Sequence, residues 1–369
     1  MLKRIPFNAP HRQFSTDETL KAKILDFIDS GPYLNGSYLV NFEKDFASYI
    51  GSDFCIGVAS GTVALELAIL SLDLPHGSEV LMNAHAGSYA AIAALKAGMI
   101  PRFFDIQADS TPSFESLQKN VSSRTQAVVL TNLYGLVSDI QNFAAFLKSQ
   151  KIYLIEDCAQ SIGARYPNSH RIAGSLSDIS TFSFYPTKNL GTFGDAGAIV
   201  TSNLEVNLKA RSLRQYGWGK RYFAEHHGGS NFRMDDLHAL VLSHKLPTLE
   251  NRNLNRIKIW KIFSEALVNS PLYLVGANGP EFVAHLAVVR TKAPQHLGNF
   301  LHEEGIETAI HYPVPDYMQP AFENYKRGAL VKTEKHCASI ISVPLHPDLT
   351  ESEIQRISSA LNRYRLPKE

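Results

Sequence analysis

The sequence predicts an α/β fold with a largely parallel sheet that helices cover on both faces. From residue 126 onward, apolar segments of strand length are spaced along the chain, namely "QAVVLTNLYG", "KIYLIEDCAQ", "ISTFSFYP" and "GAIVTSN". Strands that are buried on both faces of a parallel sheet form such nearly continuous apolar runs. The first two runs are separated by "SDIQNFAAFLKSQ", which has a helical pattern. Ligands of such sheets bind beyond the carboxyl ends of the strands, so polar residues there are candidate site residues.

Three helices are expected before these strands. Residues 15–18, "STDE", have the pattern of a capping box and predict a helix that stops at Gly31. The apolar face of that helix is formed by Leu20, Ile24, Leu25 and Ile28. A second helix begins after Ser60 as N-cap, and a third ends at Gly98, with Pro101 just beyond it.

The C-terminal third of the chain is expected to form a smaller domain. A long helix starts near Lys245 and crosses between the domains, and a second capping box at residues 350–353 opens the last helix. We therefore expect a large domain over residues 1–250 and a small domain over residues 251–369. The first 25 residues are expected to pack with the small domain.

Composition excludes several classes of function. The net charge of +1 over 369 residues gives no electrostatic footprint for nucleic acid or an anionic membrane. No segment approaches the roughly 20 apolar residues that span a bilayer, and the N-terminus has no signal-peptide core. The three cysteines show neither metal-ligand spacing nor a disulfide framework, so we expect a cytoplasmic protein without a bound metal.

Four polar features fall at strand ends or helix starts. Asp157 ends "IYLIED", and Lys188 follows "FSFYPT" in an aromatic and glycine-rich setting. "SGT" at residues 60–62 begins a helix and offers free N–H groups to an anion, and Tyr89 opens another helix. Each feature alone has an ordinary alternative: a turn former, a solvated lysine, a plain N-cap and a core aromatic.

Together the four features match the needs of one cofactor. Pyridoxal 5′-phosphate requires an amine for its aldehyde, a carboxylate for its pyridine nitrogen, a phosphate site and a surface on which its ring stacks. A lysine shielded among aromatic and glycine residues is suited to lose its proton and act as a nucleophile. The order along the chain (phosphate site, aromatic ring, Asp157, Lys188) is that of the fold-type I enzymes.

Several longer motifs carry a resemblance to a known family. They include "VASGTVALELAILSL", "LIEDCAQSIGARY", "GSLSDISTFSFYPTKNLGTFGDAGAIVT", "GGSNFRMDDLHALVLSHKLPTLENRN", "HYPVP" and "SVPLHPDL". In order and spacing they resemble the DegT/DnrJ/EryC1/StrS sugar aminotransferases over nearly the whole chain. The resemblance implies a fold-type I pyridoxal-phosphate transferase. Its large domain would hold a mostly parallel sheet of the seven-stranded type between helices, and its small C-terminal domain would be α+β.

The family's functional residues transfer to matching positions. Lys188 is implied to bind the cofactor covalently and to move the proton, and Asp157 to bind the pyridine nitrogen. The other implied cofactor contacts are Gln160 at the phenolic oxygen, Tyr89 on the ring, Gly61, Thr62 and Ser183 at the phosphate, and Asn231 at the phosphate of a partner subunit's cofactor. The partner contact implies a homodimer with shared active sites.

The resemblance also implies the reaction. L-Glutamate would donate the amino group, and the acceptor would be a nucleotide-linked keto-deoxyhexose, such as a dTDP-linked 3-keto or 4-keto 6-deoxy sugar. His311, Tyr317 and Arg233 are the expected substrate contacts. Tyr317 stands where the family frequently has histidine, and Gly87 where it often has an aromatic residue, so the acceptor sugar stays open.

Three other functions remain as alternatives. A pyridoxal-phosphate sugar dehydratase of the same family would carry histidine in place of Lys188, and a regulator without catalytic activity would not need to retain Lys188, Asp157 and Gln160. The third alternative is an aminotransferase that acts on a cyclitol or on a keto sugar without a nucleotide.

Overall fold

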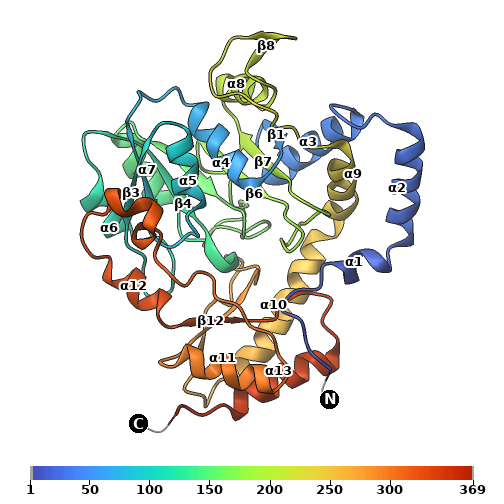
Figure 1. The fold of residues 1–369 in the computed structure, drawn as a ribbon, viewed down its shortest axis with the longest axis vertical. Helices are drawn as coiled ribbons and strands as arrows, with labels where there is room; N and C mark the ends of the chain where they lie inside the picture. Colours follow the sequence, from blue (N-terminus) through green and yellow to red (C-terminus); the bar gives the residue numbers. More distant parts are fainter. Residues whose placement is uncertain (1–2, 368–369) are drawn as a thin grey trace.

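The structure, a computed structural model, describes residues 3–367 (Figure 1). Its centre is a seven-stranded sheet in the order β1-β7-β6-β5-β4-β2-β3. Strands β6, β5, β4, β2 and β3 run parallel, whereas β7 runs antiparallel to both of its neighbours. The strands are β1 (Phe54–Val58), β2 (Glu79–Asn83), β3 (Ile100–Phe104), β4 (Thr125–Thr131), β5 (Tyr153–Asp157), β6 (Ile179–Ser183) and β7 (Gly197–Thr201). The predicted, mostly parallel α/β sheet is thus confirmed.

Helices cover both faces of this sheet because successive side chains along each strand point to opposite sides. In β5, Leu154 faces one core cluster and Ile155 the other. The first cluster packs α3 (Ser37–Ile50), α6 (Phe114–Asn120), α7 (Gln141–Ser149) and α9 (Asp236–Lys245) onto the sheet. The second packs α4 (Gly61–Leu70), α5 (Tyr89–Lys96) and α8 (Leu204–Arg214).

A smaller sheet follows α10 (Leu249–Ala266) and lies below the large one in Figure 1. It is antiparallel, in the order β10-β11-β12. Its strands are β10 (Tyr273–Leu274), β11 (Ala287–Arg290) and β12 (Ile340–Val343). The helices α11 (Pro294–Glu303) and α13 (Glu351–Arg363) belong to the same part of the chain. The remaining elements are α1 (His11–Ser15), η1 (Leu133–Gly135), η2 (Leu246–Thr248) and the hairpin of β8 (Trp218–Lys220) and β9 (Phe223–Ala224).

Two segments, one at the N-terminus and one internal, cross between the two sheets. Ile5 lies in the core of the small sheet and pairs with Ile306. In the other direction, the segment of η3 (Asp316–Met318), η4 (Pro320–Tyr325) and α12 (Val331–Cys337) returns to the large sheet. There Tyr317 and Phe322 join the second core cluster.

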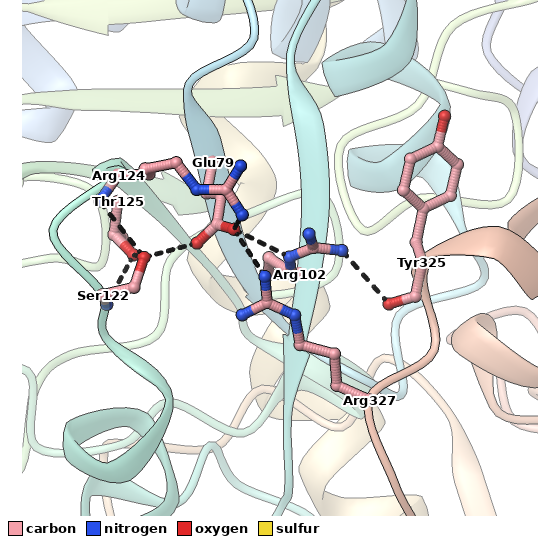
Figure 2. A network of polar contacts seen from close by, with 7 residues as sticks. All are labelled: Glu79, Arg102, Ser122, Arg124, Thr125, Tyr325 and Arg327. Atoms are coloured by element: carbon pink, nitrogen blue, oxygen red, sulfur yellow. Dashed lines mark hydrogen bonds and ion pairs between the residues drawn. The ribbon is translucent and has the colours of Figure 1, made fainter.

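Arg327, in the same returning segment, donates to the buried Glu79 at the start of β2, at 2.9 Å (Figure 2). Arg102 and Arg124 donate to the same carboxylate oxygen, and Ser122 donates to the other one. This network lies at the edge of the sheet where β2 begins, away from the edge where β5 and β6 end.

The expected helix starts are partly confirmed. Ser60 accepts a hydrogen bond from the Val63 N–H, and Thr350 and Glu353 form a complete capping box at α13. The capping box at residues 15–18 is a wrong prediction. Helix α2 (Glu18–Ser30) is capped by Asp17, whose carboxylate accepts from the Leu20 N–H at 2.9 Å.

The expected apolar face of α2 is also only partly buried. Leu20 is buried, whereas Leu25 and Ile28 are 64% and 53% exposed. Among residues 3–367, no helix combines the length and the apolar character needed to cross a membrane.

Candidate active site

A cavity of about 420 Å³ lies at the edge of the large sheet where β5 and β6 end. Eight of the side chains predicted from the sequence line it: Gly61, Thr62, Tyr89, Asp157, Gln160, Ser183, Lys188 and His311. They are far apart in the sequence, and the shared sheet edge brings them together as expected for a parallel α/β fold.

Lys188 reaches the cavity from the turn after β6. Its backbone N–H donates to the carbonyl oxygen of Tyr185 at 2.8 Å, which closes the turn. Burial lowers the pKa of the Lys188 amine, the Asp157 carboxylate offsets part of this effect, and the resulting pKa is about 8. Roughly a tenth of this amine is therefore unprotonated at pH 7, far more than for a solvated lysine. A partly neutral amine in a cavity can act as a nucleophile and as a base.

Asp157 is the last residue of β5 and is 3% exposed. Its carboxylate accepts hydrogen bonds from the Ala159 N–H at 3.0 Å and from the Thr131 hydroxyl at 3.3 Å. Burial raises the pKa of Asp157, while the Ala159 N–H, the positive charge of Lys188 and the Thr131 hydroxyl act in the opposite direction. A buried carboxylate with so few partners is suited to pair with a cation that enters the cavity.

The start of α4 forms a compact anion site. Ser60 caps the helix through the Val63 N–H, which leaves the N–H groups of Gly61 and Thr62 toward the cavity. A Cβ atom on Gly61 would lie 2.7 Å from the Cβ of Ser183, so only glycine lets the helix start and the end of β6 approach this closely. The three residues together offer backbone and hydroxyl donors at a helix N-terminus, where phosphate groups bind.

Gln160 is fixed in orientation by two hydrogen bonds. Its Oε1 accepts from the backbone N–H of Tyr134 at 2.8 Å, and its Nε2 donates to the Tyr312 hydroxyl at 3.2 Å. The amide group is therefore held with its N–H side toward the cavity that Tyr312 also lines.

The Tyr134 hydroxyl is the centre of a buried polar network behind this wall. It donates to the carbonyl oxygen of His311 at 2.6 Å and contacts Nε2 of His85 at 2.5 Å and Nε2 of His336 at 3.0 Å. Because its only hydrogen goes to His311, both imidazoles must donate to it. Burial lowers the pKa of His85 to about 3 and that of His336 to about 4, so both rings are neutral donors at neutral pH.

Tyr89 begins α5 and lies against the wall of the cavity. Its ring packs edge-on against Tyr312, with ring centroids 6.2 Å apart. Gly87, two residues earlier, has a φ of +76°, and a Cβ there would come within 2.9 Å of both tyrosine rings. The loop as it stands therefore has no room for a larger side chain at position 87, and Tyr89 lines the cavity in its place.

Two histidines line the cavity from the side of the small sheet. Burial and the charge of Lys188 lower the pKa of His311 to about 4, and its Nδ1 contacts the Ser342 hydroxyl at 2.9 Å. His285 was missed in the sequence, because a lone histidine in an apolar strand-like segment resembles a core residue. Its Nδ1 donates to Asn189 Oδ1 at 2.8 Å, because the amide NH₂ of Asn189 is already committed to Asn253 and Val283. The Nε2 of His285 is therefore an acceptor.

Three predicted residues do not line the cavity. The substrate contact expected at Tyr317 is not what the structure shows: this side chain is 1% exposed, packs in the core against Phe103, and donates its hydroxyl to Glu334. Arg233 lies instead over the ring of Tyr216, 5.4 Å from its centroid. Asn231 is exposed and pairs with Gln215.

The cavity residues fit pyridoxal 5′-phosphate. The space beside Gly61, which a Cβ would fill, lies next to the helix-start donors that suit a phosphate. The Asp157 carboxylate has few hydrogen-bond partners and can therefore accept one from a protonated pyridine nitrogen. Lys188 supplies the amine that the aldehyde of the cofactor requires.

Comparisons with known proteins agree with this fit. A model of the DegT/DnrJ/EryC1/StrS aminotransferase family matches residues 15–362. The chain is 36% identical over 340 residues to the dTDP-3-amino-3,6-dideoxy-alpha-D-galactopyranose transaminase of Aneurinibacillus thermoaerophilus, over 91% of this chain and 93% of that protein. It is 34% identical over 351 residues to the dTDP-3-amino-3,4,6-trideoxy-alpha-D-glucose transaminase of Streptomyces venezuelae, over 93% of this chain and 91% of that protein. Among solved structures, S. venezuelae DesV in complex with a ketimine intermediate is similar with a TM-score of 0.94 at 32% identity, over 99% of this chain and 100% of that chain.

Proposed function

The chain belongs to the DegT/DnrJ/EryC1/StrS aminotransferase family, and from this premise we propose that it transfers the amino group of L-glutamate to C3 of a dTDP-linked 3-keto-6-deoxyhexose. The family membership makes the protein a sugar aminotransferase that depends on pyridoxal 5′-phosphate. The amino donor, the carbon that receives the amine and the nucleotide are the proposed part.

The observation that carries the aminotransferase chemistry is that Lys188 and Asp157 line one cavity. Retention of the lysine favours transamination over the dehydratase alternative, in which histidine takes this position. Retention of seven of the eight predicted cofactor contacts in one cavity, Lys188 among them, favours an enzyme over a regulator that only binds the cofactor.

When bound, the cofactor supplies an aldehyde that reacts reversibly with amines and a ring that withdraws electrons. We propose that Asp157 holds the pyridine nitrogen protonated, and that Gly61, Thr62 and Ser183 bind the phosphate. Gln160 directs its N–H group toward the phenolic oxygen, and Tyr89 covers the ring. Lys188 Nζ, the only lysine amine on the cavity wall within residues 3–367, takes the proton from the α-carbon of the donor.

The preference for C3 rests on what similar proteins make. The two transaminases named above, from A. thermoaerophilus and S. venezuelae, are both named for dTDP sugars with the amino group at C3. The rings of His311 and His285 on the cavity wall are neutral at physiological pH, so they suit hydrogen bonds with sugar hydroxyls more than an ion pair with an acidic group on the hexose itself.

We also propose a homodimer with shared sites. Asn231 is exposed and lies outside its own cavity, as expected for a residue that binds the phosphate of the partner's cofactor. Large apolar side chains are exposed on the surface of this chain as well, with Tyr33 at 58%, Tyr222 at 74% and Phe223 at 67%. Exposed apolar side chains of this size are typical of surfaces that another chain covers.

A half-reaction tests the activity. The visible absorption band of the purified enzyme is expected to bleach with L-glutamate and to recover when a dTDP-linked 3-keto-6-deoxyhexose is added, with an aminated sugar detected by its mass. The 4-keto isomer, a UDP-linked 3-keto sugar, a cyclitol ketone and a 3-keto hexose without nucleotide serve as rival acceptors. If none of the amino acids that are offered bleaches the absorption band, the aminotransferase function is refuted.

Hybrid dimers test the shared site. Lys188→Ala and Asn231→Ala chains are each expected to be inactive alone, whereas mixing them restores about a quarter of the active sites, because one site of each hybrid is intact. No recovery after verified subunit exchange would contradict the shared site.

Two further expectations from the sequence remain proposals. The division into a large domain over residues 1–250 and a small one over residues 251–369 is one of them. Cytoplasmic location is the other, and it is supported by Cys55, Cys158 and Cys337, which are all buried free thiols.

A further inference from the structure

A second, smaller cavity lies beside Lys188. It measures about 20 Å³, enough for one or two water molecules or one carboxylate group. Asn8, Thr187 and Lys188 line both this cavity and the active site, so the two are neighbours across the same stretch of chain. Its other walls come from the N-terminal segment, from α10 and from the turn after β12.

Positive charge gathers around the small cavity. Arg252 and Arg256 line it, and the buried Lys245 lies next to them. The carboxylate that accompanies them is Asp348, which Arg252 contacts at 3.2 Å. Burial is the main reason that the pKa of Lys245 falls to about 7, and repulsion from Arg252 and Arg256 adds to it, while Asp348 and Asp17 act in the opposite direction. An anion placed among them would relieve this repulsion.

His346 gives the cavity unpartnered polar atoms. It is 6% exposed, and neither ring nitrogen has a hydrogen-bond partner among the described residues. The Nε atoms of Arg252 and Arg256 are likewise buried without a partner. Buried polar groups are normally hydrogen-bonded, so these donors indicate a place for an acceptor from outside the chain.

The active-site cavity itself offers no comparable site for an anionic substrate group. Among the described residues that line it, Lys188 is the only lysine or arginine, and two carboxylates, Asp157 and Asp195, line the same cavity. The cofactor phosphate adds further negative charge there. A donor amino acid would replace the Lys188 amine on the aldehyde of the cofactor, and of the two cavities beside Lys188 only the small one offers its carboxylates arginine side chains.

We propose that this small cavity, formed by His346, Arg252 and Arg256, binds one carboxylate of the amino donor. The proposal rests on the aminotransferase function proposed above and names the donor subsite of the same reaction. A pyrophosphate or a hexose is too large for about 20 Å³, so the nucleotide sugar does not compete for it. Arg256 is also tied to the active site, because its Nη1 donates to the carbonyl oxygen of His285 at 3.2 Å.

Two variants and one control test the subsite. His346→Phe removes both ring nitrogens without breaking a hydrogen bond of the fold, and Arg252→Gln removes one charge. The control, Lys258→Gln, makes the same change of charge on an exposed residue of the same helix. Circular dichroism and thermal unfolding verify the fold of each variant.

The first measurement is binding, by calorimetric titration of each holoenzyme with glutarate, a dicarboxylate that cannot react. The glutarate Kd is expected to rise on the order of tenfold in both variants, because a charge-assisted hydrogen bond is lost in each. The control keeps the wild-type Kd. An unchanged Kd in both variants, as expected if the cavity holds only water, would overturn the proposal.

The second measurement separates the two half-reactions. In both variants the KM for L-glutamate is expected to rise on the order of tenfold, whereas the reverse half-reaction with the amino sugar changes less than about twofold. L-Alanine identifies the carboxylate: an equal loss with alanine assigns the α-carboxylate, and a loss confined to glutamate assigns the γ-carboxylate.

Equal losses in both half-reactions would overturn the subsite, and so would no loss with either amino acid. The latter outcome would indicate that a lysine or arginine of the partner subunit binds the donor carboxylate instead. These outcomes differ from a failure of the proposed function, in which the wild-type enzyme itself does not respond to any amino acid.

Discussion

Replacing Glu79 by glutamine is expected to destabilise the protein by about 2–4 kcal/mol while leaving the active site intact. Glu79 is fully buried at the start of β2. Its Oε1 accepts from Arg102 at 3.0 Å, Arg124 at 2.7 Å and Arg327 at 2.9 Å, and its Oε2 accepts from Ser122 at 2.6 Å (Figure 2). Glutamine keeps the shape of the side chain but leaves three arginines without their carboxylate.

The magnitude follows from the exposure of each arginine. The Arg102 side chain is 13% exposed, and removal of the partner of a buried charge costs about 3–5 kcal/mol. The Arg124 and Arg327 side chains are 57% and 48% exposed, so water solvates them and each pair contributes at most about 1 kcal/mol. Glutamine also retains part of the hydrogen bonding, which brings the expected loss to about 2–4 kcal/mol.

Urea unfolding at pH 7.5, followed by tryptophan fluorescence and circular dichroism, measures this loss. Arg124→Gln is the matched control, because it removes one exposed pair from the same carboxylate, and its cost is expected to stay below about 1 kcal/mol. The rate of the half-reaction at 20 °C is expected to be unchanged in both variants. Equal destabilisation by Glu79→Gln and Arg124→Gln would refute the assignment of the loss to the buried charge.

Acid provides an independent check. Burial raises the pKa of Glu79, but hydrogen bonds from Ser122 and Arg102 and the charges of Arg102 and Arg327 outweigh it, so its pKa in the folded protein lies below the usual range. The stabilisation from the ionised carboxylate is therefore present above the unfolded-state pKa of about 4.3 and disappears as the pH falls through the lower folded-state value. The difference in stability between wild type and Glu79→Gln should shrink over that range. A difference that stays constant between about pH 5 and pH 2 would contradict the role of charge.

Three further predictions concern the active site. Gly61→Ala should weaken cofactor binding at least tenfold, because the new Cβ would lie 2.7 Å from the Cβ of Ser183. Spectrophotometric titration of the apoenzyme with the cofactor measures this affinity. A wild-type affinity would show that the start of α4 and the end of β6 can move apart without loss of binding. Tyr134→Phe removes the hydroxyl that donates to the carbonyl oxygen of His311. The kcat/KM for the sugar should therefore fall about tenfold, while the affinity for the cofactor stays within about twofold. An unchanged kcat/KM would show that Tyr134 does not position His311. The rate at which apoenzyme binds the cofactor covalently should rise with pH and level off above about pH 8, because only the neutral Lys188 amine reacts; a rate that is flat from pH 7 to pH 9 would contradict the lowered pKa.

The part of the fold that sequence patterns could predict is the part governed by local rules. Strands that are buried on both faces form apolar runs in the sequence, and these runs identified β4, β5, β6 and β7. The rule that ligands bind at the carboxyl ends of parallel strands then placed Asp157 and Lys188 in one site, although 31 residues separate them. Helix caps behaved similarly at Ser60 and Thr350, where no other acceptor competes.

The failures are cases in which distant residues decide. Asp17 replaces the expected cap at residue 15 because Ser15 is the last residue of α1, and the Asp17 carboxylate is also held by His244 of α9, at 2.9 Å. Tyr317 follows the "HYPVP" segment closely, yet the chain turns there into the core of the large sheet, and the hydroxyl finds Glu334. Neither partner is visible in a local window of sequence.

His285 and His346 show the same limit for function. Each stands in an apolar segment where a histidine resembles a satisfied core residue. Only the three-dimensional contacts reveal that His285 presents an acceptor to the active site and that His346 has no partner at all among the described residues. Counting hydrogen bonds at every buried histidine would have identified both, but this count requires coordinates.

The N-terminal segment with Ile5 and the returning segment of η3, η4 and α12 each pack against a part of the chain that is distant in sequence, and this has a consequence for biosynthesis. Ile5, made first, finds its partner only when Ile306 has left the ribosome, and the large sheet lacks Tyr317, Phe322 and Arg327 until almost nine-tenths of the chain has been translated. Neither core can close early, so the nascent chain exposes apolar surface throughout elongation. Cutting the gene near codon 250 would give two fragments that each miss a piece of their own interior, so we expect neither fragment to fold properly when it is produced alone.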